Sequence, residues 1–320
     1  MFAAQVVAVH TGDHLGASLP GIVQHFPGVP AFFFISGFLV YGSYAQNNGA
    51  DYWRNRSLRL LPALIFATLG GVVVALLAHG WRDLFEYPGT YVTWILAQIT
   101  LGQAYNPSHF RYIGVGVING SLWTLTTEIL FYVLVPIITW VEHRFRMIVP
   151  SLMAMSFAIY TFGPDLLDFE VVLGKTLFEF LALTPLIWGW MFGFGILAFK
   201  HFDRLPIRWL PLAGIPMALM IWQGDGALFH SAENRLGIFY FCAYAAIVLW
   251  LSFGIRAPKL LPDFSYGAYI WHMPIINLLL VFAIPNAAPV AIGLTLLFAV
   301  ASWYMVEKPA LRLKTYPAPS

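Results

Sequence analysis

A carboxylate stands inside an otherwise apolar segment of this 320-residue chain, in the run Ser-Leu-Trp-Thr-Leu-Thr-Thr-Glu-Ile-Leu-Phe-Tyr at 121–132. Helical spacing would align this residue, Glu128, with three polar side chains: Ser121, Thr124 and Tyr132. An ionisable group is costly to bury in a membrane, so it is a candidate for function. Helix packing could explain the hydroxyl groups, but packing does not require a carboxylate. We therefore expect the stripe to face the bundle interior or a cavity, with Glu128 as the candidate functional residue.

Two histidines are candidates for proton transfer, because an imidazole titrates near neutral pH. His10 closes the first apolar stretch of the chain. His272 lies in Phe-Ser-Tyr-Gly-Ala-Tyr-Ile-Trp-His-Met-Pro at 264–274, where Ser265 and Tyr269 would share its helical face. The alternatives are an interfacial histidine at a helix end for His10 and a hydrogen-bonded structural histidine for His272.

A basic run, Tyr-Trp-Arg-Asn-Arg-Ser-Leu-Arg-Leu-Leu-Pro, occupies residues 52–62. Its Arg56 and Arg59 are three residues apart, so they would share a helical face and could grip one phosphate group between them. The alternative is that the run only anchors the chain to the cytoplasmic face, as basic residues do in most membrane proteins.

The proportions of hydrophobic and charged residues indicate that the helices carrying these candidate residues lie in a membrane. Hydrophobic residues make up 59% of the chain and charged residues only 10%. A soluble domain carries about 25% charged residues. We therefore expect an all-α, polytopic transmembrane bundle formed by a single domain over residues 1–320, with the lipid bilayer as its surroundings.

Several other kinds of site are not indicated. The single Cys242 excludes an internal disulfide and a cysteine metal cluster. Neither a phosphate-binding loop, a His-Glu-x-x-His zinc motif nor a Gly-x-Ser-x-Gly elbow occurs, so no metal is expected. A net charge of +2, without a long basic run, gives no indication of nucleic-acid binding.

Nine segments are long and apolar enough to be considered as membrane spans, for which about 20 residues are needed. They are 28–47, 60–80, 122–141, 147–163, 177–199, 206–223, 236–255, 264–284 and 288–306. Two further segments are less regular: 1–10 is short, and 91–105 is short and interrupted by polar residues.

The distribution of lysine and arginine predicts which loops are cytoplasmic. The basic clusters are Arg54/Arg56/Arg59, Arg144/Arg146, Lys200/Arg204/Arg208, Arg256/Lys259 and Lys308/Arg312/Lys314. Three apolar segments separate the first cluster from the second, and an odd number of crossings cannot return the chain to the same side. We therefore expect 91–105 to enter the membrane and return without crossing. Ten spans with both termini in the cytoplasm result, provided that residues 1–10 belong to a first span.

The stretch 1–10 reaches only about 15 Å as a helix, roughly half the thickness of the hydrocarbon core. Either the first helix is short, or the true start codon lies upstream of Met1. We favour the second interpretation.

Six of these motifs, in this order, resemble those of the acyltransferase-3 family of membrane acyltransferases, which includes bacterial O-acetyltransferases of lipopolysaccharide, exopolysaccharide and antibiotic sugars. The matching stretches are Val-Val-Ala-Val-His (6–10), Phe-Phe-Phe-Ile-Ser-Gly-Phe (32–38), Arg-Ser-Leu-Arg-Leu-Leu-Pro (56–62), the Glu128 run (121–132), the His272 run (264–274) and Val-Glu-Lys-Pro (306–309). Each is weak alone, but together they span nearly the whole chain.

The resemblance implies about ten transmembrane helices in a bacterial cytoplasmic membrane. It also implies transfer of an acyl group, usually acetyl, from cytoplasmic acyl-CoA to a hydroxyl of a carbohydrate or glycoconjugate. The family's essential histidine corresponds to His10, and its Arg-x-x-Arg pair to Arg56 and Arg59. The family's Ser-Leu-Trp…Glu segment corresponds to Ser121, Trp123 and Glu128.

The chain departs from the family pattern at one point. Relatives usually carry an arginine about three helical turns before the histidine, and here that position would fall upstream of Met1. Some relatives also carry a C-terminal hydrolase-like domain, which this sequence, ending at Ser320, does not include.

On this interpretation, His10 takes the proton of the sugar hydroxyl or briefly carries the acyl group itself. Glu128 orients the imidazole or stabilises the imidazolium, while Arg56 and Arg59 hold the phosphates of CoA. Tyr132, Tyr269 and His272 support the site. The leading alternative is a transporter or flippase in which Glu128 and His272 relay protons, although the inverted repeats common in such proteins are not visible.

Overall fold

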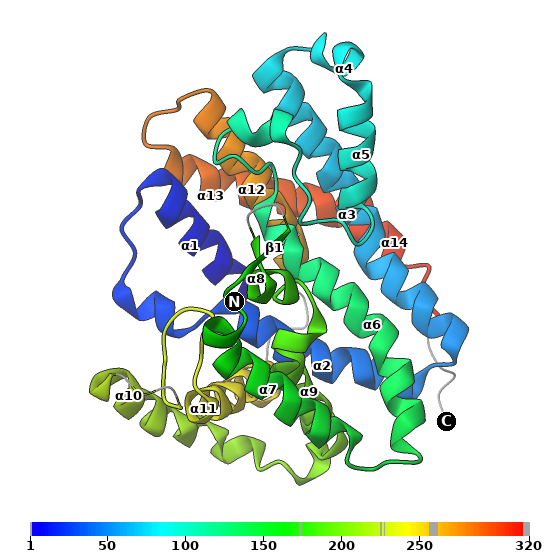
Figure 1. Cartoon of the computed structure of the whole chain (residues 1–320), viewed down its shortest axis with the longest axis vertical. Coiled ribbons are helices and arrows are strands. Elements are labelled where there is room, and N and C mark those ends of the chain that lie inside the picture. Colours follow the sequence, from blue (N-terminus) through cyan, green and yellow to red (C-terminus); the bar gives the residue numbers. More distant parts are fainter. Residues whose placement is uncertain (1, 173–174, 225, 227, 256–261, 316–320) are drawn as a thin grey trace.

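The computed structural model describes residues 2–172, 175–224, 226, 228–255 and 262–315. Over these residues the chain is helical apart from connections and one small hairpin, in which β1 (Glu170–Val172) pairs antiparallel with β2 (Lys175–Thr176) (Figure 1). The all-α class expected from the sequence is therefore confirmed. Arg256 and Lys259, which the topology argument used, lie outside the described residues.

The helices follow one another in short, connected pieces. In chain order the α-helices are α1 (Phe2–Leu15), α2 (Gly28–Gln46), α3 (Gly49–His79), α4 (Asp83–Glu86), α5 (Pro88–Gln98), α6 (Trp123–Glu142), α7 (Ile148–Leu166), α8 (Leu177–Leu181), α9 (Pro185–Lys200), α10 (Gly214–Gln223), α11 (Ile238–Leu249), α12 (Ser265–Val281), α13 (Ala287–Ser302) and α14 (Lys308–Leu311). The 3-10 segments are η1 (Gly21–His25), η2 (Ser108–Tyr112), η3 (Gly120–Leu122), η4 (Phe202–Arg204) and η5 (Ile207–Ala213), and the π-helical segments are η6 (Trp250–Gly254) and η7 (Trp303–Glu307).

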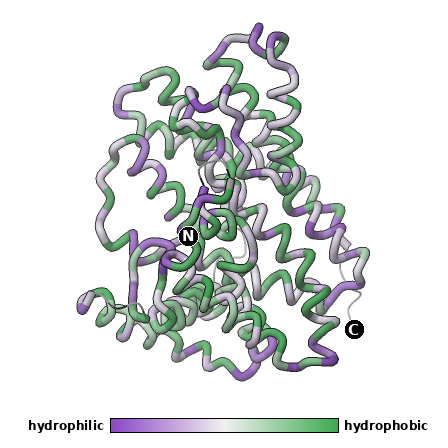
Figure 2. The backbone as a smooth tube through the Cα atoms, in the orientation of Figure 1, coloured by the Kyte–Doolittle hydropathy of each residue, from purple (hydrophilic) through white to green (hydrophobic). Residues whose placement is uncertain are grey.

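Among the described residues, four helical stretches are long and apolar enough to cross a membrane: 21–46, 49–79, 120–142 and 287–311. Two shorter apolar helices cover 185–200 and 238–254. Polar residues are concentrated in the connections between the long apolar helices (Figure 2). These features agree with an all-α membrane protein, while the count of ten spans remains a prediction.

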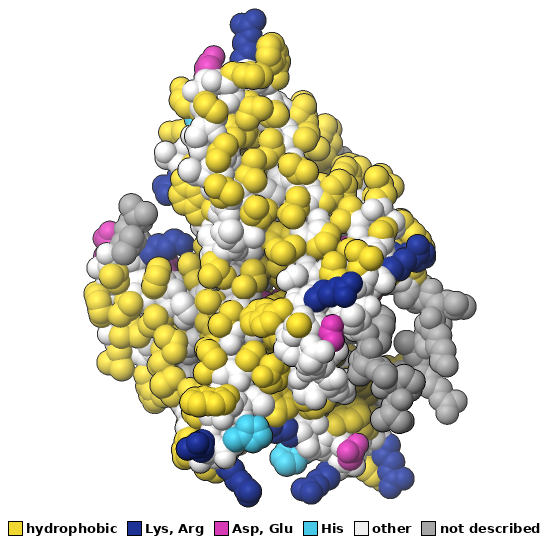
Figure 3. Space-filling model, turned by 90° about the vertical axis from the view of Figure 1, so that its right-hand side faces the viewer, with side chains coloured by type: hydrophobic (Ala, Val, Ile, Leu, Met, Phe, Trp, Pro, Cys, Tyr) yellow, Lys and Arg dark blue, Asp and Glu magenta, His cyan; other side chains and the backbone are white. Residues whose placement is uncertain are grey.

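Helix α3 shows how a span divides its surface between lipid and protein. Its exposed side is a stripe of large apolar side chains at intervals of four residues: Ile65, Leu69, Val73 and Leu77. Such a stripe is unfavourable on a surface in contact with water but suits contact with lipid tails. Apolar side chains also cover much of the face seen in Figure 3.

The boundaries of several segments differ from those expected. Helix α3 begins at Gly49 rather than at 60, because the basic run before the apolar stretch is itself helical. Helix α1 continues to Leu15, so His10 lies within its helix, and the alternative of a histidine at a helix end does not apply. The expected span 177–199 is divided into α8 and α9, and Pro185 stands at the first turn of the second piece.

The segment expected to enter the membrane and return is partly helical. Helix α5 covers Pro88–Gln98, and an irregular chain with the 3-10 segment η2 follows it as far as η3. Gln98 satisfies part of that irregular backbone, because its side-chain amide donates to the carbonyl oxygens of Gln103 and Tyr105 at 3.4 and 3.1 Å. No stretch between 80 and 119, all of which the structure describes, meets the criteria for a span.

Candidate active site

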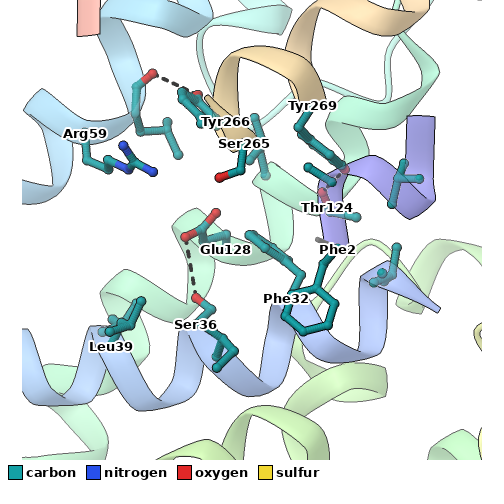
Figure 4. Close-up of a pocket in the computed structure, with 18 of the residues that line it drawn as sticks. Phe2, Phe32, Ser36, Leu39, Arg59, Thr124, Glu128, Ser265, Tyr266 and Tyr269 are labelled. Carbon is teal, nitrogen blue, oxygen red and sulfur yellow. Dashed lines mark hydrogen bonds between the residues drawn. The ribbon is translucent and has the colours of Figure 1, made fainter. Parts of the chain in front are cut away.

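Two cavities lie inside the helical bundle, and each contains some of the residues singled out in the sequence. The first, here called the arginine cavity, has a volume of about 340 Å³ and is lined from α1, α2, α3, α6 and α12 (Figure 4). Its polar lining residues are Ser36, Arg56, Arg59, Thr124, Glu128, Tyr132, Asp263, Ser265, Tyr266 and Tyr269. Phe2, Phe32 and Leu39 contribute an apolar side.

Glu128 points into the arginine cavity from α6. Its carboxylate accepts hydrogen bonds from the hydroxyl groups of Tyr132 at 2.6 Å and Ser36 at 3.5 Å. Thr124 and Tyr132 line the same cavity, whereas Ser121 lies in η3, before the helix, and lines the second cavity described below. Three members of the predicted polar stripe therefore line one cavity, and the fourth lines the other. Ser36 belongs to the Phe-Phe-Phe-Ile-Ser-Gly-Phe motif, but sequence reasoning did not assign it to the site.

Arg59 forms ion pairs with two carboxylates. Its guanidinium lies 2.7 Å from an oxygen of Asp263 and 3.8 Å from an oxygen of Glu307, a residue of the Val-Glu-Lys-Pro motif. Burial would raise the pKa of the Asp263 carboxyl, but the charge of Arg59 and hydrogen bonds from Ser265 hold that pKa below its ordinary value. Asp263 is therefore ionised at neutral pH and neutralises much of the Arg59 charge.

Arg56 lacks such a partner. One of its terminal nitrogens donates to the carbonyl oxygen of Leu39 at 3.1 Å, and its guanidinium lies over the ring of Tyr132 at 5.6 Å. Its Nε is buried and has no hydrogen-bond partner among the described residues. A buried donor on a cation is expensive to leave unpaired, so this nitrogen is available to an anion that enters the cavity.

A third cation stands close to this pair. Burial, together with the neighbouring charges of Arg56 and Arg59, lowers the pKa of the Lys314 ammonium to about 8. The next residue, Thr315, exchanges backbone hydrogen bonds with the Asn55 side chain at 2.9 and 3.1 Å, which fixes this segment against the start of α3. The sequence placed Lys314 on the cytoplasmic side but gave no reason to place it beside the arginine pair.

The second cavity, here called the histidine cavity, has a volume of about 560 Å³. It is lined from α1, η1, η3, the start of α6 and α12. Its polar lining residues are Gln5, His10, Asp13, Gln24, Ser121, Trp123, Glu233, Asn234 and Tyr269. Sequence reasoning did not identify the contribution of Gln24, Glu233 and Asn234, because these residues come from connections without a recognisable pattern.

His10 and His272 form a pair, although 262 positions separate them in the sequence. His10 Nδ1 lies 2.8 Å from His272 Nε2, and the ring centroids are 5.0 Å apart with an angle of 28° between the ring planes. The other nitrogen of His272, Nδ1, lies 3.3 Å from the carbonyl oxygen of Ala268. His272 is fully buried, whereas His10 lines the histidine cavity. Two histidines that the sequence could only treat separately are therefore one unit.

Tyr269 belongs to the walls of both cavities, together with Val6 and Val29. Its hydroxyl donates to the carbonyl oxygen of Ser121 and contacts the hydroxyl of Thr124, each at 2.5 Å. The two cavities are therefore separated by a wall one side chain thick.

Helix α12 holds the segment before α6 in place. Asn277 accepts from the backbone N–H of Val115 at 2.8 Å and donates to the carbonyl oxygens of Val117 and Ile118 at 2.9 Å. Asn119 donates to the carbonyl oxygen of Ile270 at 2.9 Å. These bonds position Ser121 and the start of α6. Asn277 lies three residues beyond the His272 motif, yet a single buried amide gives no signal in the sequence.

Glu128 and His10 do not contact each other. Glu128 bonds Tyr132 and Ser36 in the arginine cavity, while His10 bonds His272 beside the histidine cavity. The expectation that Glu128 directly orients the imidazole is therefore not met in this structure, where His272 occupies that position. Trp123, the remaining residue of the motif, lines the histidine cavity and packs against Trp188 at 5.6 Å between ring centroids.

Within the described residues, one group of side chains could jointly hold a metal ion, and it consists of His79, Asp83 and His109. None of the three lines either cavity.

Comparison with known proteins places this arrangement in a family. The chain matches the family described as Acyltransferase domain over residues 3–307. It is 29% identical to Nodulation protein 10 of Rhizobium leguminosarum bv. viciae, over 98% of this chain and 92% of that protein. It is 23% identical to Putative acetyltransferase ORF330 of Acidianus two-tailed virus, over 82% of this chain and 77% of that protein.

A further relative is O-acetyltransferase OatA of Staphylococcus aureus, which is 25% identical over 92% of this chain. The match covers 53% of that protein, so the chain spans about half its length. No solved structure is a significant match.

Proposed function

The chain belongs to the acyltransferase-3 family and is an O-acyltransferase, and from that premise we propose that it transfers an acetyl group from acyl-CoA to a hydroxyl of a carbohydrate or glycoconjugate. One observation carries the proposal: a cavity lined by Arg56, whose Nε has no hydrogen-bond partner among the described residues, and a cavity lined by His10 share a wall at Val6, Val29 and Tyr269. Donor and acceptor can then meet at that wall from opposite sides.

The donor occupies the arginine cavity. Arg56 and Lys314 supply positive charge near its cytoplasmic end, where the phosphates of CoA would bind. A volume of about 340 Å³ is small for a whole cofactor, so the acyl-pantetheine arm enters while the nucleotide stays at the mouth. The Glu128 carboxylate, fixed by Tyr132, is placed to accept hydrogen bonds from the amide groups of that arm.

The acceptor sugar occupies the histidine cavity, where amide, carboxylate and indole side chains are available to bind hydroxyl groups and to stack on a pyranose face. Gln5, Gln24 and Asn234 offer amides, Asp13 and Glu233 offer carboxylates, and Trp123 offers the aromatic surface. This mixture suits a neutral polyhydroxylated ligand better than an ion.

The His10–His272 pair supplies the base. If His272 Nδ1–H donates to the Ala268 carbonyl, His272 Nε2 carries a lone pair and accepts from His10 Nδ1–H. His10 Nε2 is then unprotonated and free to accept the proton of a sugar hydroxyl. The reverse tautomer would leave His272 Nδ1 as a lone pair facing a carbonyl oxygen, which is unfavourable. His272 is thus a positioning residue for His10.

The reaction then balances as a simple transfer. The sugar oxygen forms a bond to the acyl carbon, the thioester C–S bond breaks, and the proton held by His10 leaves with the CoA thiolate. A route through a transient acyl-His10 uses the same residues in two steps. In both cases the protein works as a multi-pass protein of the bacterial cytoplasmic membrane, with the donor on the cytoplasmic side and both termini there.

The experiment is a thioester-release assay on purified protein in detergent, with acetyl-CoA and a panel of carbohydrates. A Cys242→Ser background removes the protein's single thiol from the readout. We expect CoA release that depends on an acceptor, with acetylated sugar as its product. Donor binding without release, or movement of solute across proteoliposomes without acetylation, would instead support the transporter interpretation.

A further inference from the structure

A cluster of metal-binding side chains lies at the end of α3 farthest from the arginines. His79 closes α3, Asp83 begins α4, and His109 lies in η2. Arg56 and His79 are 23 residues apart on α3, which corresponds to about 35 Å at about 1.5 Å per residue. That length exceeds the hydrocarbon core of a bilayer, so the cluster and the donor-binding residues lie at opposite membrane faces.

The three donor atoms form a nearly equilateral triangle. His79 Nδ1 lies 3.3 Å from Asp83 Oδ2 and 3.3 Å from His109 Nε2, and His109 Nε2 lies 3.0 Å from Asp83 Oδ2. Zinc bonds to nitrogen and oxygen of about 2.0–2.1 Å place the donors of a tetrahedral ion about 3.3 Å apart. An ion could therefore sit just above this triangle without rearrangement of the ligands, with its fourth position open.

The surroundings of the triangle resemble those of a metal centre. The Tyr91 hydroxyl donates to Asp83 Oδ2 at 2.6 Å and fixes the carboxylate, as outer hydrogen bonds do for metal ligands. The ring of Tyr87 packs on His109 at 4.4 Å between centroids. Asp83 is buried, but the side chains of His79 and His109 are 21% and 26% exposed, which leaves a route for an ion from solvent.

We propose that His79, Asp83 and His109 bind a divalent transition-metal ion of the zinc type, with water as the fourth ligand. Two imidazoles and one carboxylate are a ligand set that zinc favours over magnesium or calcium. The ion links the end of α3 to the irregular segment that runs from η2 to Ser121, so it is a structural clip that stabilises the approach to the histidine cavity. The sequence did not indicate it, because the third ligand follows the second by 26 residues and lies in the short 3-10 segment η2.

The competing explanation is a hydrogen-bonded triad in which both imidazoles donate to Asp83 and no metal binds. His109→Gln separates the two, because a glutamine amide can still donate to Asp83 but is a poor zinc ligand. The matched control is His143→Gln, which removes a histidine from the exposed turn after α6. Asp83→Asn and Tyr91→Phe test the carboxylate and its outer partner.

The measurement is metal content and affinity of the full chain, purified in detergent, stripped with a chelator and titrated in separate samples with Zn²⁺ and with Co²⁺. We expect one equivalent per chain, visible d–d bands of tetrahedral Co²⁺, and a thermal midpoint that rises with Zn²⁺ and falls with the chelator. His109→Gln and Asp83→Asn should weaken binding by more than about 100-fold, and Tyr91→Phe by about 10-fold. His143→Gln should bind as the parent does.

The proposal is overturned if the stripped parent binds no Zn²⁺ in the micromolar range, or if His109→Gln retains the parent affinity. A thermal midpoint that stays near the parent value in His109→Gln and that does not change with Zn²⁺ in either protein would establish the hydrogen-bonded triad instead. These readouts do not depend on acyl transfer, so they stand apart from the test of the proposed function.

Discussion

The two arginines of the Arg-x-x-Arg pair differ in their partners, although their spacing made them look equivalent. Arg59 is held by Asp263 and Glu307, and Glu307 is almost completely buried. Arg56 has a carbonyl, an aromatic ring and an unpaired Nε. We therefore propose that the two residues have different roles: Arg59 stabilises the bundle, and Arg56 binds the donor.

Replacing each arginine by alanine should separate these roles. Arg56→Ala should weaken binding of acetyl-CoA by about 1.5–3 kcal/mol, the range for a charge-assisted hydrogen bond, with little change in the thermal midpoint. Arg59→Ala should lower the thermal midpoint, because it leaves buried Glu307 without its cation. Calorimetric binding and thermal unfolding in one detergent measure both quantities. Equal loss of donor affinity at unchanged stability in both variants would contradict this division.

Lys314 should make donor binding sensitive to pH. Because burial and the neighbouring arginines lower the pKa of this ammonium to about 8, it is charged at pH 7 and loses its charge as the pH rises through 8. The phosphates of the donor remain anionic, so affinity should fall by roughly tenfold between pH 7 and 9.5, about the effect of one charged contact. Titration with a non-hydrolysable thioether analogue of acetyl-CoA measures this.

Lys314→Arg is the matched variant, since arginine stays charged over this range. The donor affinity of Lys314→Arg should not change with pH. The donor affinity of Lys314→Met should also be independent of pH, but weak. A fall of equal size in the arginine variant would show that another group is titrating.

At the scale of the elements, the site depends on how closely helices approach. Helices α2 and α9 cross at Gly37 and Gly195, where a Cβ atom would lie 2.0 Å from the carbonyl oxygen of Phe192 and 2.1 Å from that of Phe34. Only glycine permits this backbone contact. The crossing positions Ser36, the neighbour of Gly37, against Glu128.

Gly37→Ala should therefore destabilise the protein by at least about 1–3 kcal/mol, the usual effect of overpacking, and should lower acyl transfer with it. The control is Gly293→Ala on α13, where an added Cβ meets nothing within 4 Å. Thermal unfolding of the two variants measures the difference. If Gly37→Ala unfolds at the parent temperature, the close crossing is not needed for stability.

The sequence was informative about elements wherever hydrophobicity alone decides the outcome. The expected segment 28–47 agrees with α2, and 147–163 with α7, because uninterrupted apolar runs must be helical in a bilayer. The helix boundaries predicted from the sequence were wrong where the boundary contains charged residues or proline, as at the start of α3 and at Pro185. The sequence could not predict the His10–His272 contact, because nothing in either motif encodes a partner in a distant helix.

At the scale of the whole molecule, segments that the distribution of basic residues assigned to the cytoplasmic side lie close together. The Thr315 hydroxyl donates to Asp51 at 2.6 Å, so the end of the described chain lies against the start of α3. Lys200 at the end of α9 pairs with Glu142 at the end of α6. On the far side, Glu233 N–H donates to the Gln24 carbonyl at 3.0 Å.

Cysteine labelling should report these two sides. In a Cys242→Ser background, Arg82→Cys in the turn between α3 and α4 should react with an impermeant maleimide in intact cells. Arg312→Cys should react only after permeabilisation, because we place the C-terminal segment in the cytoplasm. The reverse pattern would invert the topology and would move the arginine cavity to the wrong side for cytoplasmic acyl-CoA.

The central claim is that His10 accepts the proton of the acceptor hydroxyl, and acetyl transfer by His10→Gln tests it most directly. Glutamine keeps a polar side chain in the histidine cavity but cannot take up a proton. His14→Gln is the matched control, because His14 lies one turn further along α1, with its ring 5.9 Å from that of His10, and does not line the cavity.

The measurement is the rate at which radiolabelled acetyl moves from acetyl-CoA to acceptor, with donor affinity determined on the same preparations. We predict that His10→Gln loses transfer by about 10²–10⁴-fold while binding the donor as the parent does, and that His14→Gln transfers at nearly the parent rate. Transfer by His10→Gln at close to the parent rate would contradict the account.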